Sequence, residues 1–307
     1  MKHVGIIGSG NVGANSAFFI AENRTASVTL VDVKEGLSVG KALDMLQAGP
    51  IRRYDTDIRG ENDIEAIRGS DIVVIAAGRV RAPDQSRDEL YKDNARLTAE
   101  ICEQIRQLTP HAIVINIVEP VDMITLLAQK VLGFDRNRVL GIGGLLSSTR
   151  LRYLISNALG VSSREVTGMV IGPHRPGMVA IRDTIRVSGI PADRILGTEK
   201  LDAIIDEVRK AGDTILQMAQ RHTSFYAPSA AVAALVLPLV RGSVSIMPVS
   251  MRLEGEYGLN DIAVSVPARI CRNGVEKVVP VRMTVEEKKQ FSDAADDLRS
   301  SLARVTR

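Results

Sequence analysis

The sequence predicts an α/β protein in two parts, a doubly wound parallel sheet followed by an α+β unit. Residues 1–144 alternate short apolar runs with helical segments, which is typical of a parallel sheet covered by helices on both faces. From Leu145 onward, long helices mix with strand-like runs instead. We therefore expect one domain over residues 1–144 and a second over residues 145–307, a division that also suits the chain length.

The strands expected in the first part are apolar throughout, as strands buried on both faces of a sheet should be. They cover residues 4–7, 28–31, 72–77, 112–118 and 139–142, and a helix is expected over residues 89–108. In such a sheet, ligands bind beyond the carboxyl ends of the strands. Loops that follow these strands are therefore the first places to look for a site.

The second part should combine helices with hairpin-forming strands. Asn273-Gly274 is a typical hairpin turn, and Thr284 followed three residues later by Glu287 is a capping box that opens a last helix. Helices are expected over residues 199–221 and 230–240, and strands over residues 166–171, 185–187, 262–266, 268–271 and 275–281.

A glycine motif follows the first expected strand. Gly8, Gly10 and Gly13 give the pattern G-x-G-x-x-G, and Asp32 ends the second strand about 20 residues later. Gly8 permits a tight turn, Gly10 lets the backbone approach a pyrophosphate, and Gly13 lets the helix pack close to the strand. The motif predicts a Rossmann dinucleotide-binding unit. Because the Asp32 carboxylate would repel a ribose phosphate, NAD is favoured over NADP.

Composition excludes several classes of protein. The net charge of +3 comes from 39 Lys+Arg against 36 Asp+Glu, and the chain has no Trp and few aromatic residues, so neither a nucleic acid nor a membrane surface is an expected partner. The apolar stretch at residues 230–240 is too short to span a bilayer. Two cysteines and no room for a signal peptide predict a cytoplasmic protein without disulfides.

Basic residues gather where the predicted sheet should bind ligands. Arg79, Arg81 and Arg87 follow the strand at 72–77, and guanidinium groups suit carboxylates. Arg150 and Arg152 lie two residues apart on a helix, so only one of them can enter the cleft while the other pairs elsewhere. We expect an anionic small-molecule substrate.

Of the four histidines, only His174 has a context suited to proton transfer. It lies in a loop at the end of an apolar strand, where a general acid or base would stand close to a ligand.

Taken together, separate segments of the whole chain resemble the lactate/malate dehydrogenase family, and their spacing is closest to the malate dehydrogenases that resemble lactate dehydrogenases. The segments are residues 8–13, 31–33, 40–44, 76–78, 86–90, 119–122, 148–153, 168–172, 226–228 and 253–258.

The resemblance implies substrate-site roles and an NAD-dependent reaction between malate and oxaloacetate. Arg150 would bind the carboxylate next to the reacting carbon, and Arg87, on a mobile loop, would polarise the substrate carbonyl. His174 would pass a proton to the carbonyl oxygen as hydride arrives from NADH. Arg81 would bind a second carboxylate, where glutamine would suit lactate.

The resemblance also implies cofactor contacts, an assembly and a setting. Residues 40–44 resemble the family's subunit-interface helix, so a homodimer or homotetramer is expected. The tricarboxylic acid cycle is the expected pathway, and we assign no metal ligands. Expected cofactor-binding residues are Gly8, Gly10, Asn11, Val12, Gly13, Asp32, Ala77, Gly78, Asn94 and Val118.

Three residues depart from the family pattern at the reacting centre. Ser147 stands where an aspartate should pair with His174, Glu119 stands where an asparagine is expected before Pro120, and Arg175-Pro176 replace Gly-Asp. Ser147 can orient the imidazole but supplies no charge. One interpretation is an altered dehydrogenase with a very basic pocket, in which Arg175 joins the substrate site and Glu119 is a counter-charge or a substitute partner for His174. The other is an NAD(H)-binding paralogue with impaired catalysis.

Overall fold

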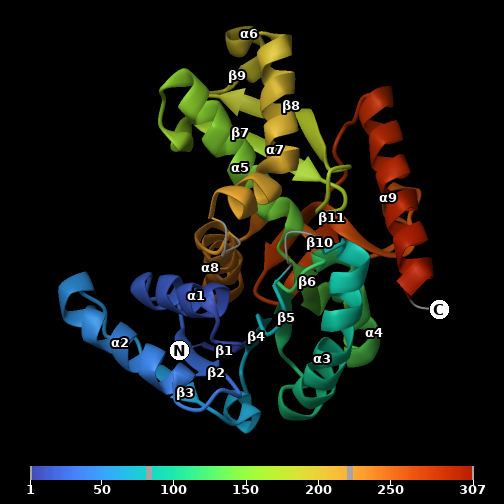
Figure 1. Ribbon diagram of the computed structural model, residues 1–307. Coiled ribbons are helices and arrows are strands. Elements are labelled where there is room, and N and C mark those ends of the chain that lie inside the picture. The colour runs from blue at the N-terminus through green and yellow to red at the C-terminus, as the bar shows by residue number, and fades with distance from the viewer. Residues whose placement is uncertain (1, 81–84, 220–223, 306–307) are drawn as a thin grey trace.

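The computed structural model describes residues 2–80, 85–219 and 224–305. Figure 1 shows two lobes, with the N-terminal strands and helices below and the yellow-green elements of the second half above. The strands are β1 (His3–Ile7), β2 (Ser27–Val31), β3 (Ile58–Glu61), β4 (Ile72–Ile75), β5 (Ile113–Asn116), β6 (Val139–Gly141), β7 (Val166–Ile171), β8 (Val179–Val187), β9 (Ile190–Pro191), β10 (Ser245–Glu254), β11 (Asn260–Cys271) and β12 (Gly274–Val278). The α-helices are α1 (Asn11–Glu22), α2 (Leu37–Arg52), α3 (Arg87–Leu108), α4 (Val121–Leu132), α5 (Gly143–Leu159), α6 (Ala192–Leu196), α7 (Thr198–Ala219), α8 (Tyr226–Arg241) and α9 (Val285–Val305).

The lower lobe is built on a parallel sheet in the order β3-β2-β1-β4-β5-β6. This is the doubly wound Rossmann arrangement, with the order reversing between β1 and β4, and it confirms the predicted fold class. The strands expected at 72–77 and 112–118 end earlier, at Ile75 and Asn116. Their last predicted residues instead form loops at the carboxyl edge of the sheet.

The second half of the chain completes the first sheet. Strands β10, β11 and β12 continue it in antiparallel fashion beyond β6, and Ser250 of β10 pairs with Gly141. The prediction of two strands at 262–266 and 268–271 was wrong, because β11 runs unbroken through Pro267. Pro267 lies opposite Pro248 in the ladder, so two residues that lack a backbone donor face each other and pairing continues on either side.

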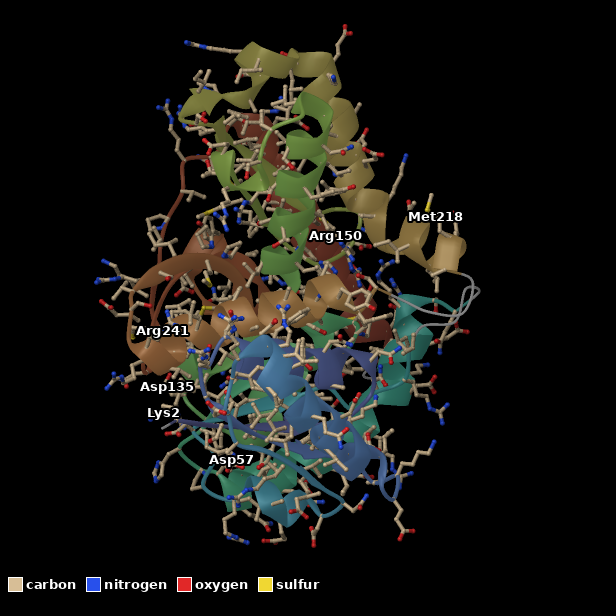
Figure 2. All side chains as sticks on the ribbon, turned by 90° about the vertical axis from the view of Figure 1, so that its left-hand side faces the viewer. Lys2, Asp57, Asp135, Arg150, Met218 and Arg241 are labelled. Atoms are coloured by element: carbon tan, nitrogen blue, oxygen red, sulfur yellow. The ribbon has the colours of Figure 1, made fainter. Side chains whose placement is uncertain are left out.

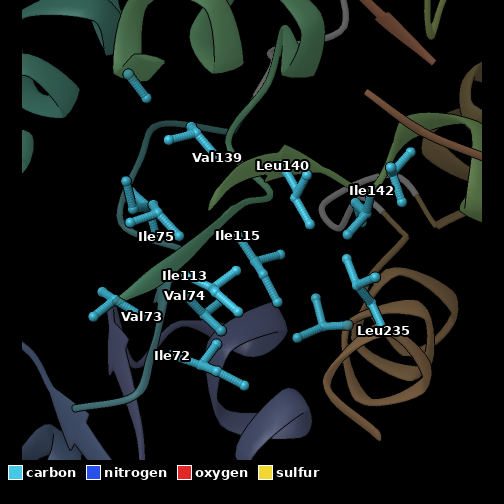
Figure 3. Close-up of a cluster of buried hydrophobic side chains, with 14 of the residues drawn as sticks. Ile72, Val73, Val74, Ile75, Ile113, Ile115, Val139, Leu140, Ile142 and Leu235 are labelled. Carbon is cyan, nitrogen blue, oxygen red and sulfur yellow. The ribbon is translucent and has the colours of Figure 1, made fainter. Parts of the chain in front are cut away.

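The middle of the sheet is a rigid apolar platform. All four side chains of β4 are buried, as are those of Ile113 and Ile115 in β5. Figure 3 shows these side chains beside Leu140 of β6, with Leu235 of α8 packed near Ile142. Burial of each aliphatic side chain contributes about 1.5–3 kcal/mol. The loops at the strand ends therefore project from a closely packed apolar base.

The upper lobe has its own sheet and core. Strands β7, β8 and β9 form an antiparallel sheet, and helices α5 and α7 pack beside it. Leu151 and Ile155 of α5, together with Ile204 and Val208 of α7, belong to this second core. The capping box predicted at Thr284 and Glu287 is confirmed at the start of α9, with both of its hydrogen bonds formed. Among the described residues, no helix has the length and apolarity needed to cross a membrane.

Candidate active site

The glycine turn joins β1 to α1, and each of its glycines meets different surroundings. A Cβ on Gly13 would lie 1.9 Å from the Gly8 carbonyl oxygen, and one on Gly8, where φ is +102°, would lie 2.5 Å from the Ala77 nitrogen. A Cβ on Gly10 would meet no atom within 4 Å. The first and third glycines are therefore needed for packing, whereas Gly10 leaves open space above the turn.

Asp32 lies at the end of β2, beside this turn. Its carboxylate accepts hydrogen bonds from the Ser9 backbone N–H at 2.7 Å and from the Lys34 N–H at 3.0 Å. Each carboxylate oxygen has a second lone pair, so these bonds orient the group without using up its capacity. The carboxylate is thus held at the edge of the open space next to Gly10.

Asn94 of α3 ties together the two loops that follow β4 and β5. It is fully buried, and its carboxamide donates to the carbonyl oxygens of Arg79 (3.2 Å) and Glu119 (2.7 Å) while accepting from the Arg79 N–H (2.7 Å). Gly78 makes room for this contact, because a Cβ there would lie 2.6 Å from Val118. Asn94 therefore positions both loops from within, and its contact with the cofactor stays a prediction.

A cavity of about 190 Å³ lies between the lobes, at the carboxyl edge of the parallel sheet. It brings together predicted residues from both halves of the chain, with Val12, Gly78 and Val118 on the cofactor side. The predicted substrate-site residues that line it are Arg87, Glu119, Arg150, His174 and Arg175. The sequence located this site correctly beyond the ends of β1, β4 and β5.

His174 stands in the loop after β7 with its ring 10% exposed. Its Nδ1 lies 3.0 Å from the Ser147 hydroxyl oxygen, and that hydroxyl donates to the Gly143 carbonyl in the preceding turn of α5. Ser147 is 1% exposed and lies behind the ring rather than on the cavity wall. Burial lowers the pKa of His174, nearby Arg150 and Arg87 lower it further, and Glu119 opposes them.

Glu119 faces the other side of the same ring. One of its oxygens, Oε1, lies 3.6 Å from His174 Nε2, and the other, Oε2, accepts a hydrogen bond from the Val121 N–H at 3.1 Å. Val121 is the first residue of α4, so the helix N-terminus stabilises the negative charge. Glu119 is therefore fixed in the cavity with one oxygen directed at the imidazole.

Asp122, which the sequence analysis did not single out, holds the histidine loop from below. Its carboxylate accepts from the His174 backbone N–H at 2.5 Å and from the Ser250 hydroxyl at 2.7 Å. Burial raises the pKa of Asp122 to about 6. Its place within the family segment 119–122 was the only sequence signal that could have pointed to this role.

Arg150 of α5 lines the cavity, and Figure 2 shows it near the level where the two lobes meet. Burial lowers its pKa, and the Glu119 and Asp213 carboxylates oppose that shift. Arg152 turns away and donates to the Val166 and Ser163 carbonyl oxygens, which confirms that only one of these two arginines enters the cleft. Arg150 is thus a largely buried cation that a substrate carboxylate in the cavity could meet.

Helix α7 closes the cavity with a set of residues that the sequence analysis missed. Arg209, Gly212, Asp213 and Leu216 recur at helical spacing and line one wall. Their spacing was visible in the sequence, but the face that turns to the cleft is decided by packing of α7 on α5. Asp213 adds a carboxylate beside Arg150.

The other predicted arginines are placed as follows. Arg87 lines the cavity as the first residue of α3, after a capping box between Ser86 and Glu89, and so belongs to a helix rather than to a loop. Arg175 has its guanidinium turned to α9, where it donates to Asp297 at 2.8 Å. Arg175 also lines the cavity, so its predicted contact with the substrate stays a prediction. Arg81 lies outside the described residues.

The geometry of the glycine turn fits a dinucleotide. Helix α1 begins without a side-chain cap, so its first N–H groups are open to a pyrophosphate in the space above Gly10. The predicted contacts at Asn11 and Val12 lie in this first turn, and Asp32 stands where ribose hydroxyls would donate. Val118 and Gly78 line the cavity at the nicotinamide end, while Ala77 lies beside Gly78 with its backbone against Gly8.

Comparison of this chain with known proteins shows which family it belongs to. The family model described as lactate/malate dehydrogenase, NAD binding domain, matches residues 2–141, and that of the alpha/beta C-terminal domain matches residues 145–307. Malate dehydrogenase of Roseiflexus sp. (strain RS-1) is 40% identical over 300 residues, covering 98% of this chain and 97% of that protein. Malate dehydrogenase of Heliobacterium modesticaldum is 36% identical over 302 residues and 98% of each chain.

Solved structures agree. The crystal structure of Cryptosporidium parvum malate dehydrogenase is similar with a TM-score of 0.97 at 30% identity, over 99% of each chain. A lactate dehydrogenase of the same organism, solved with lactic acid and nicotinamide adenine dinucleotide, has a TM-score of 0.96 at 30% identity, over 100% of this chain and 98% of that one. The fold and site define a dinucleotide-dependent dehydrogenase. The chain belongs to the lactate/malate dehydrogenase family, and its lower lobe is the family's NAD-binding domain.

Proposed function

We propose that this protein is an NAD-dependent malate dehydrogenase that interconverts malate and oxaloacetate. The observation that carries the proposal is a single cavity in which His174 and Arg150 stand opposite Val12, Gly78 and Val118. A dicarboxylate in this cavity would have its reacting carbon between the imidazole and the cofactor side. The names of the relatives favour malate as the substrate.

In the proposed reaction, residues of this chain bind the substrate, polarise its carbonyl and transfer the proton. When bound, NAD(H) supplies or accepts the hydride. Arg150 binds the substrate carboxylate through a guanidinium fork, Arg87 polarises the carbonyl, and His174 gives or takes the proton. Arg81 is proposed to bind the second carboxylate, and Ser147 to orient the imidazole.

The alternative is a binding protein with impaired turnover. It is favoured by one specific observation, the serine hydroxyl in place of a carboxylate at His174 Nδ1. Loss of such a carboxylate in a serine protease triad costs on the order of 10⁴ in kcat. We prefer the enzyme because Glu119 places a carboxylate 3.6 Å from the other ring nitrogen.

The proposal extends to assembly, domains and setting. Helix α2 exposes Val39, Leu43 and Leu46, spaced so that they share one face, and Figure 1 shows α2 at the outer edge of the lower lobe. This apolar stripe supports a homodimer or homotetramer. We further propose domains over residues 1–144 and 145–307, a cytoplasmic location and a place in the tricarboxylic acid cycle.

Substrate preference tests the proposal. Oxaloacetate should drive NADH oxidation faster than pyruvate does, measured as kcat/KM from the absorbance of NADH. In the Arg81→Gln variant the preference should move toward pyruvate, because the second carboxylate loses its cation. Equal rates with both acids in the unmodified protein would contradict the malate assignment.

A further inference from the structure

The imidazole of His174 is contacted on both ring nitrogens by groups of this chain. On one side, Nδ1 lies 3.0 Å from Ser147 Oγ, whose own proton is donated to the Gly143 carbonyl. This arrangement assigns the serine oxygen as an acceptor and the proton of the neutral ring to Nδ1, in keeping with the hydrogen bond to the Gly143 backbone that raises the pKa of His174. The lone pair of the neutral ring is then on Nε2.

That lone pair faces the Glu119 carboxylate. Oε1 of Glu119 is 3.6 Å from Nε2, and the side chain cannot simply swing away because Oε2 accepts from the Val121 N–H. Two acceptors that face each other repel unless a proton stands on one of them. The Glu119 carboxylate therefore favours a proton on Nε2 and opposes the effect of burial on the ring.

The same separation leaves room for a substrate oxygen. An oxygen about 2.8 Å from both Nε2 and Oε1 fits, because 3.6 Å is less than twice a hydrogen-bond length. Both groups can therefore contact the atom that gains or loses the proton. The Glu119 side chain is 44% exposed, so the pair also has a route to solvent.

We propose that Glu119 and His174 form a proton-sharing pair, in which Glu119 is a second proton-handling group and supplies the charge that Ser147 lacks. The proposal rests on the dehydrogenase function given above. In oxidation, the substrate O–H bond breaks and its proton goes to Nε2, while the C–H hydrogen leaves with its electron pair to NAD⁺ and the C=O bond forms. The carboxylate stabilises the imidazolium and passes the proton to solvent, and reduction runs in reverse.

Other charged groups surround the pair and influence whether the imidazole keeps its proton. Cations tend to drive the proton off the imidazole, and carboxylates tend to retain it. The groups that face the pair are Arg79 after β4, Arg87 on α3, Asp122 on α4, Arg150 on α5, Arg175 after β7, and Arg209 and Asp213 on α7. Glu119 is the carboxylate among them that lies on the Nε2 side of the ring within 4 Å.

Titration of His174 in the whole protein tests the pair without any substrate. Nitrogen NMR of ¹⁵N-histidine-labelled protein follows the ring, and the His174→Gln variant assigns its signal. Glu119→Gln should lower the titration midpoint by about one pH unit, because an opposite charge is removed. Asp213→Asn removes an equal charge from the same cavity and should shift the midpoint much less, because the Asp213 carboxylate acts on Arg150.

Steady-state kinetics then test the chemical role. Glu119→Gln should lower kcat for oxaloacetate reduction by about 10²-fold, while KM falls because a carboxylate no longer repels the dianion. Ser147→Asp in the same chain should recover at least about 10-fold of that loss, since it restores a charge at Nδ1.

The outcomes separate this proposal from the proposed function. An unchanged His174 midpoint in Glu119→Gln, or an unchanged kcat, would overturn the pair even if malate dehydrogenase activity is found. If the unmodified protein turns over no 2-oxo acid, the proposed function fails, and the second proton-handling role fails with it. A midpoint shift in that case would leave only a static ion pair.

Discussion

The glycine turn of Gly8, Gly10 and Gly13 presents backbone groups next to Val12 of the cavity, whereas His174 and Glu119 present ionisable side chains inside it. The glycine turn depends on shape, because an added Cβ would collide with backbone atoms at two of the three glycines. The region of His174 and Glu119 depends on protonation. The two regions therefore differ in what a substitution changes, which is backbone packing at the glycine turn and protonation at His174 and Glu119.

The largest loss of activity is expected from substitution of His174. His174→Gln should lower kcat on the order of 10²–10⁴-fold, because the general acid is lost. The dissociation constant for NADH, measured by calorimetry, should not change, since the glycine turn is untouched. Retained turnover would mean that another group transfers the proton.

Substitution of Arg150 should cause a smaller loss of activity. Arg150→Lys keeps the charge but loses the planar fork, so kcat/KM for oxaloacetate should fall about 10–100-fold, mainly through KM. Arg152→Lys is the matched control on the same helix, because Arg152 binds backbone carbonyls outside the cavity. Equal effects of the two variants on KM would contradict the assigned carboxylate contact.

Two glycine variants test the shape of the glycine turn. Gly13→Ala should lower the free energy of unfolding by about 1–3 kcal/mol, because its Cβ would overlap the Gly8 carbonyl. Gly10→Ala has space and should fold with nearly unchanged stability, yet bind NADH more weakly. Thermal unfolding and calorimetry on both proteins separate the two roles. A stable Gly13→Ala protein would show that the turn is less tightly packed than described.

The smallest effect concerns pH. The pKa of His174 is lowered below 6.5, mainly by burial, so the neutral ring persists as the pH falls to 6.5. Malate oxidation needs that neutral base, and its kcat/KM should therefore change less than about 2-fold between pH 8 and 6.5 and decline only below. A decline that begins above pH 7 would place the pKa of the base higher than burial allows.

The fold was predictable where the pattern is local. The apolar run of β4 and the glycine turn can each be recognised from a few consecutive residues. Strand β10 was missed because its place beside β6 is decided by a pairing between Ser250 and Gly141, far apart in the sequence. Long-range contacts of this kind leave no periodic signal.

The site was predictable in its parts but not in its contacts. Glu119, Ser147 and His174 were each singled out. Only the folded arrangement of β5, α5 and β7 brings Ser147 and Glu119 to the two sides of the His174 ring. Nothing local shows that Asp297, 122 residues after Arg175, pairs with its guanidinium. The sequence therefore could not predict which charged side chains form ion pairs with residues far away in the chain.

Binding and turnover measured on one sample test the central claim most directly, that the altered reacting centre still performs chemistry. Calorimetry should show NADH binding to the purified protein, and addition of oxaloacetate to that sample should then oxidise NADH over many turnovers. NADH binding without turnover across a panel of 2-oxo acids would contradict the account and identify the chain as a binding protein.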